Sequence, residues 1–127
     1  MKYYLDSSVI VDYIFGNAIS IAIISQLDGE LFSSRLSRTE TIRIIAKTHP
    51  EFLEDAYTFL ESINAIEISE SILLRVEEYS SENTLKTSDA IHVATAEYLL
   101  DEDDYLITFD KQMATNAKKL GLQVISS

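Results

Sequence analysis

The chain has 127 residues, enough for one domain with a single hydrophobic core, and it contains no cysteine, which excludes disulfides and cysteine-rich zinc sites and suits a reducing cytoplasm. Its 21 Asp and Glu residues against 10 Lys and Arg residues give a formal net charge of −11, which argues against a broad, non-specific grip on nucleic acid. No apolar run reaches the ~20 residues that cross a bilayer, and Asp6 and Asp12 interrupt the apolar segment that a signal peptide needs, so we expect neither feature.

Short apolar runs alternate with helical spacings along the whole chain. The first run, residues 1–5, is typical of a buried strand, and the spacing changes to that of a helix at Asp6. Gly16-Asn17 predicts a turn, and Pro50 predicts the end of a helix because the residue before proline avoids the helical region. We expect strands over residues 1–5, 30–34, 65–68, 105–109 and 122–125. We expect helices over residues 6–14, 19–27, 37–49, 51–63, 72–79, 87–99 and 110–120.

This alternation decides the fold class that we predict. Strands separated by helices imply right-handed crossovers and a mostly parallel sheet with helices on both faces. We therefore expect an α/β fold in which residues 1–127 form a single domain around a five-stranded, mostly parallel sheet.

Four acidic residues fall where strand ends and helix starts meet at one edge of such a sheet. They are Asp6, Glu40, Asp89 and Asp110. Each has a structural explanation: Asp6 and Asp110 as helix N-caps, Glu40 in a capping box with Ser37, and Asp89 as a first-turn acid. However, two carboxylates about 4 Å apart repel by roughly 4 kcal/mol at an effective dielectric constant of 20, so a cluster needs protons or a cation. Oxygen ligands of this charge suit Mg²⁺ or Mn²⁺, which activate water toward a phosphodiester.

Four segments, taken in order, resemble one family. They are Leu5-Asp6-Ser7-Ser8-Val9, Glu40 within an apolar helix, Ser88-Asp89-Ala90-Ile91-His92-Val93-Ala94-Thr95-Ala96, and Leu106-Ile107-Thr108-Phe109-Asp110-Lys111. As an ordered set they resemble PIN-domain ribonucleases, in particular VapC-type toxins of type II toxin–antitoxin modules, over essentially the whole chain.

The resemblance implies a PIN-like fold with the first strand at the centre of the sheet, and a Mg²⁺- or Mn²⁺-dependent endoribonuclease that uses a metal-activated water. The acidic set that holds the metal would be Asp6, Glu40, Asp89 and Asp110. Ser8 and Thr108 would orient a carboxylate or a water. The resemblance also implies a cytoplasmic homodimer that is inhibited by a cognate antitoxin, whose tail occupies the acidic groove.

Each of the remaining candidate residues has a functional and a structural explanation. Basic residues near the acidic edge could hold RNA phosphates on its rim, with ordinary surface charge as an equal alternative. They are Arg35, Arg38, Lys86 and Lys111. His92, one helical turn after Asp89, is better explained as a helix-packing histidine than as a metal ligand or general base. The Ile-rich segment 19–27 is more apolar than one covered face needs, which favours a dimer interface.

Three other functions compete with the nuclease. A phosphoacceptor receiver needs an Asp after the third strand, and residues 65–69 supply none. A phosphatase with an Asp nucleophile needs a second Asp where Ser8 stands. The main alternative is a PIN-like RNA- or protein-binding module without nuclease activity, whose carboxylates serve only as caps.

Overall fold

The structure of the protein is a computed structural model that describes residues 1–126. The strands are β1 (Lys2–Leu5), β2 (Glu30–Ser34), β3 (Asn64–Ile66), β4 (Tyr105–Ile107) and β5 (Val124–Ile125). The helices are α1 (Ser7–Ile14), α2 (Ala18–Ser25), α3 (Arg35–Thr48), the 3-10 helix η1 (Pro50–Phe52), α4 (Leu53–Glu61), α5 (Glu70–Glu78), α6 (Thr87–Leu99) and α7 (Lys111–Lys119).

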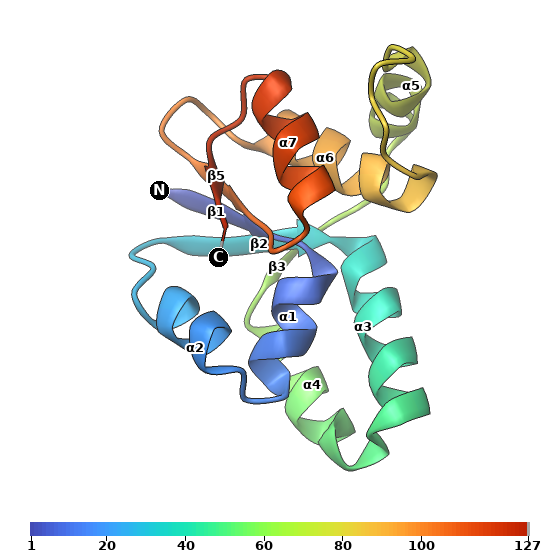
Figure 1. The fold of residues 1–127 in the computed structure, drawn as a ribbon. Coiled ribbons are helices and arrows are strands. Elements are labelled where there is room, and N and C mark those ends of the chain that lie inside the picture. Colours follow the sequence, from blue (N-terminus) through green and yellow to red (C-terminus); the bar gives the residue numbers. More distant parts are fainter. Residues whose placement is uncertain (127) are drawn as a thin grey trace.

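The five strands form one parallel sheet in the order β3-β2-β1-β4-β5, which confirms the predicted fold class. The first strand is central: Tyr4 pairs with Phe32 of β2 on one side and with Leu106 of β4 on the other. Because all strands run the same way, their carboxyl ends lie at one edge of the sheet. The segments that follow β1, β2 and β4 therefore start next to one another (Figure 1).

Each face of the sheet has its own hydrophobic core, because successive side chains of a strand point to opposite faces. Tyr3 and Leu5 of β1 pack with α1, α3 and α4, whereas Tyr4 packs with α6 and α7. In Figure 1, α1 to α4 accordingly lie on one side of the sheet and α6 and α7 on the other. This arrangement places helices on both faces, as the alternating pattern predicts.

The start of α3 differs from the sequence-based expectation. The helix begins at Arg35, directly after β2, and its N-cap is Ser34, whose hydroxyl accepts a hydrogen bond from the Leu36 amide at 3.1 Å. Ser37 is instead buried and hydrogen-bonds to Ser33. The predicted capping box of Ser37 and Glu40 is therefore wrong, and Glu40 lies in the second turn with no capping role.

Several other boundaries also differ. The helix expected over residues 51–63 is divided into η1 and α4, with Pro50 as the first residue of η1. The last strand is only Val124–Ile125, because its pairing with β4 is limited to Leu106 and Ile107. Gly121, predicted as the end of the preceding helix, has a φ of +92°, a conformation that favours glycine.

Helix α2 leaves part of its apolar surface uncovered. Ile19 is 54% exposed and Ile21 is 41% exposed. Within residues 1–126 no single helix is long and apolar enough to span a membrane, and α1 and α2 meet that description only as a pair bent by 108°.

Thr41 is expected to limit stability. Its side chain is fully buried in α3, and within residues 1–126 its Oγ1 is a buried side-chain oxygen that has no hydrogen-bond partner. Replacing this hydroxyl with a methyl group removes a desolvation cost, so Thr41→Val should raise the free energy of unfolding by about 1 kcal/mol in denaturant titrations. Thr95→Val is the matched control, because Thr95 is equally buried but donates to the Ile91 carbonyl at 2.6 Å. Equal destabilisation by both changes would contradict this explanation.

Candidate active site

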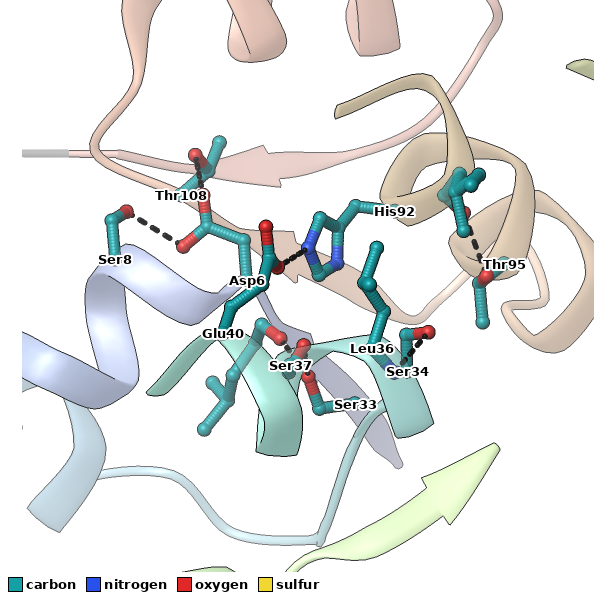
Figure 2. A network of polar contacts seen from close by, with 12 residues as sticks. Asp6, Ser8, Ser33, Ser34, Leu36, Ser37, Glu40, His92, Thr95 and Thr108 are labelled. Carbon is teal, nitrogen blue, oxygen red and sulfur yellow. Dashed lines mark hydrogen bonds and ion pairs between the residues drawn. The ribbon is translucent and has the colours of Figure 1, made fainter. Parts of the chain in front are cut away.

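Asp6 is the buried centre of the acidic edge. It follows β1, caps α1, and is only 2% exposed. Its Oδ1 accepts a hydrogen bond from the Ser8 hydroxyl at 2.8 Å, and its Oδ2 accepts one from the Thr108 hydroxyl at 2.6 Å (Figure 2). Oδ1 also accepts one from the Val9 amide at 3.1 Å. Burial raises the pKa of Asp6 above its ordinary value, and these three donors and the nearby His92 oppose that rise.

Thr108 links Asp6 to Asp110. While its hydroxyl donates to Asp6, its oxygen accepts a hydrogen bond from the Asp110 amide at 3.1 Å. Asp110 then caps α7, accepting from the Met113 amide at 2.9 Å, and its side chain remains exposed. The ends of β1 and β4 are thus joined through one buried hydroxyl, and two of the acidic residues are real N-caps.

Asp89 lies in the first turn of α6, where it is half-buried and close to other charges. Burial raises the pKa of Asp89, the carboxylates of Asp110 and Glu40 raise it as well, and His92 and Lys86 lower it. The fold therefore brings Asp89 within electrostatic range of both Asp110 and Glu40.

Glu40 reaches the same region from α3 and pairs with His92. Its Oε1 lies 2.7 Å from Nε2 of His92, and the other ring nitrogen, Nδ1, lies 2.7 Å from the Tyr4 hydroxyl. His92 is 1% exposed, so it does pack within α6 as the sequence suggested, but both of its nitrogens are hydrogen-bonded. The only signal in the sequence was a polar residue on a wide apolar face, and nothing there named Glu40 as its partner.

The basic residues divide into two groups. Lys86 is the N-cap residue of α6 and Lys111 is the first residue of α7, so both are exposed beside the acidic edge. Arg35 hydrogen-bonds to Thr39 on its own helix, and the Arg38 guanidinium lies 5.3 Å from the ring centroid of Tyr57 in α4. Because Glu40 faces α6 while Arg38 faces α4, the structure does not bring Arg38 to the carboxylates.

The carboxylate oxygens at this edge are the type of ligand that Mg²⁺ and Mn²⁺ prefer. Within residues 1–126 no three Asp, Glu or His side chains converge closely enough to enclose an ion by themselves. Mg²⁺ keeps several waters and is commonly bound through only one or two carboxylates, and Mn²⁺ also prefers oxygen ligands. A partly hydrated Mg²⁺ or Mn²⁺ beside Asp6, Asp89, Asp110 and Glu40 is therefore consistent with the residues present.

The chain is an α/β domain whose sheet is entirely parallel, and acidic side chains lie beyond the carboxyl ends of the central strands. Residues 3–119 match the family model of the PIN domain, and the chain belongs to this family. No curated protein matches the chain by sequence at a significant level.

Solved structures share the fold at low sequence identity. A chain of a toxin–antitoxin complex from Klebsiella pneumoniae superposes with a TM-score of 0.75 at 24% identity, covering 88% of this chain and 90% of the other. VapBC2 from Rickettsia felis, bound to a fragment of its promoter DNA, gives 0.77 at 16% identity, covering 100% and 99%. VapC20 from Mycobacterium tuberculosis, a sarcin-ricin loop cleaving toxin, gives 0.74 at 11% identity, covering 89% and 93%.

Asp6→Asn should change how stability depends on pH. Because the pKa of Asp6 is higher in the folded chain, the folded state binds the proton more tightly. The free energy of unfolding therefore falls as pH rises from the unfolded pKa of about 3.9 through the folded pKa. Asn does not titrate, so the stability of the variant relative to the wild type should grow across this window and then stay constant.

Urea titrations in the presence of a chelator, at a series of pH values, measure this difference. Asp103→Asn is the control, because Asp103 is exposed before β4, at the opposite edge of the sheet. A relative stability of Asp6→Asn that declines with rising pH would show that the pKa of Asp6 is lowered by folding.

Proposed function

We propose that the chain is a metal-dependent endoribonuclease, the toxin component of a toxin–antitoxin system, that hydrolyses RNA phosphodiester bonds. The observation that carries this proposal is the gathering of carboxylates at one edge of the sheet: Thr108 links the buried Asp6 to Asp110, and Asp89 lies within electrostatic range of Asp110 and Glu40, which raise its pKa. Such an arrangement is unfavourable unless protons or a cation offset it. Membership of the PIN family and the similarity in fold to a toxin that cleaves the sarcin-ricin loop support the reaction class.

Each residue has a distinct part in this proposal. Asp6, Asp89 and Glu40 would hold the ion directly or through water, and Asp110 would support it or a second ion. When bound, Mg²⁺ or Mn²⁺ lowers the pKa of a coordinated water and offsets the charge of the phosphate. Ser8 and Thr108 fix the orientation of Asp6, since their hydroxyls donate to its two oxygens.

RNA binding is proposed along the starts of α6 and α7. Lys86 and Lys111 are exposed there, next to the acidic edge. The amino ends of both helices carry partial positive charge, which favours phosphate. A small basic rim of this kind lets a chain of charge −11 hold RNA locally. Arg35, which is exposed at the first residue of α3, remains a candidate for this rim, whereas Arg38 does not, because its guanidinium packs on Tyr57.

We propose two protein partners, a second copy of this chain and a cognate antitoxin, from the exposed apolar surface and from the solved structures that share the fold. Ile19 and Ile21 of α2 expose apolar surface that suits a homodimer interface. The similar structures from Klebsiella pneumoniae and Rickettsia felis are toxin–antitoxin complexes, which supports a cognate antitoxin for this chain. A basic antitoxin segment would be attracted by the acidic edge, and the proposed site of action is the cytoplasm.

Cleavage of RNA tests the nuclease directly. The purified chain, free of antitoxin, should cut a panel of transfer and ribosomal RNAs at discrete sites with Mg²⁺ or Mn²⁺ and not with EDTA. Asp6→Asn and Asp89→Asn should each lower the rate on the order of a hundredfold or more, since a bound ion supplies several kcal/mol of transition-state stabilisation. Asp103→Asn should cut at the wild-type rate.

Two outcomes would overturn this reading. Cutting that survives both substitutions would come from a contaminating nuclease. A folded, metal-loaded chain that binds these RNAs without cutting them would be a binding module, with Asp6 and Asp110 acting as N-caps alone.

The lysine rim makes a separate prediction about salt. In the uncleaving Asp6→Asn background, Lys86→Ala and Lys111→Ala should each weaken RNA binding at low salt. Each should also reduce the slope of log affinity against log salt concentration by about 0.7 to 1, the value for one lost phosphate contact. Fluorescence anisotropy over a salt series measures this. Lys118→Ala is the control because Lys118 lies in the last turn of α7, and an equal effect there would indicate a non-specific charge effect.

A further inference from the structure

His92 stands at the end of a chain of hydrogen bonds that begins in the sheet. The Ser34 amide donates to the Tyr4 hydroxyl at 3.1 Å, Tyr4 contacts Nδ1 of His92 at 2.7 Å, and Nε2 of His92 contacts Glu40 at 2.7 Å. A carboxylate accepts hydrogen bonds, so Nε2 of His92 is the donor to Glu40. When the ring is neutral, Nδ1 accepts the Tyr4 proton, and the donors then run from Tyr4 through His92 to Glu40.

The ring of His92 is buried and is held by Tyr4. Tyr4, its partner, is fully buried in the central strand and paired with both β2 and β4. The rings of Tyr4 and His92 meet edge to face, with centroids 6.1 Å apart. A turn of the imidazole would therefore break a buried hydrogen bond and disturb a core, so the position of Nε2 is set by the sheet.

Glu40, in contrast, depends on His92 for its position. Asp6 has donors on both carboxylate oxygens, but within residues 1–126 the Glu40 side chain has one hydrogen bond, from His92 to Oε1 (Figure 2). Its side chain is 28% exposed, so packing alone does not hold it. A glutamate has several rotatable bonds and samples many rotamers unless a contact selects one.

From these contacts we infer that His92 is a positioning residue for the candidate metal site: it fixes Glu40 through Oε1, so that Oε2 would be available to hold the ion. This inference rests on the proposed function, since it gives Glu40 a ligand role there. His92 itself touches neither metal nor RNA. Tyr4 of β1 in turn holds His92 through the hydrogen bond to Nδ1.

A cycle of substitutions tests the inference by Mn²⁺ affinity, measured by titration calorimetry without RNA. His92→Leu removes the donor to Glu40 and should weaken Mn²⁺ binding about ten- to a hundredfold, the usual cost of losing a partner that orients a metal ligand. His92→Gln keeps an amide donor where Nε2 stands and should recover most of this loss. In a Glu40→Gln background, His92→Leu should have little further effect, because the two residues act through one contact.

Val93→Ala controls for a general loss of packing. Val93 is fully buried on the same helix and lies in the core formed with Tyr4. It should lower the melting temperature and leave the Mn²⁺ affinity of the folded chain unchanged. Melting curves for all variants give the folded fraction at the assay temperature.

The outcomes separate this inference from the proposed function. A His92→Leu loss that adds fully to that of Glu40→Gln, or that His92→Gln does not recover, would overturn the positioning role. Wild-type chain that is folded but binds no Mn²⁺ would also overturn it. Wild-type chain that binds Mn²⁺ and cuts no RNA would overturn the nuclease, while the affinity cycle would still decide whether His92 positions Glu40.

Discussion

A buried carboxyl group at the end of the central strand is the constraint on which the site depends. Asp6 is almost removed from solvent, and Ser8, the Val9 amide and Thr108 offset part of the cost of its burial by donating hydrogen bonds to it. Two of these donors follow in α1, and the third comes from the end of β4. The order of the strands, with β1 next to β4, is therefore a condition for bringing the Thr108 donor to Asp6.

The carboxylates at this edge are not equivalent. Asp6 and Asp110 cap α1 and α7, so the fold itself gains from them. Glu40 caps nothing, and its hydrogen bond is to a buried histidine of another helix. Glu40 does not stabilise the start of its own helix, and its partner comes from a different helix. A functional role therefore explains Glu40 better than a structural one does.

The sequence predicted the sheet and both aspartate caps because these depend on local patterns. The apolar run before Asp6 and the helical spacing after it are visible within ten residues, as is Thr108 two positions before Asp110. The start of α3 could not be read in this way: the Ser37 and Glu40 spacing imitates a capping box, while β2 in fact continues into the helix with no loop and Ser34 becomes the cap. The pairing of Glu40 with His92 joins positions 52 residues apart and follows only from the packing of α6 over the sheet.

The central place of β1 also has a consequence for how the chain folds. The strand is made first, yet one of its two edges pairs with β4, and the contact between Thr108 and Asp6 spans 102 residues. Contacts this distant in sequence slow folding, because a long loop must close before they form. During synthesis that edge of β1 remains unpaired until β4 has been made, and a ribosome-bound fragment that ends before β4 has neither Thr108 nor Asp110. The acidic edge is thus completed late, and the unfinished chain carries an open strand edge, a feature that favours aggregation.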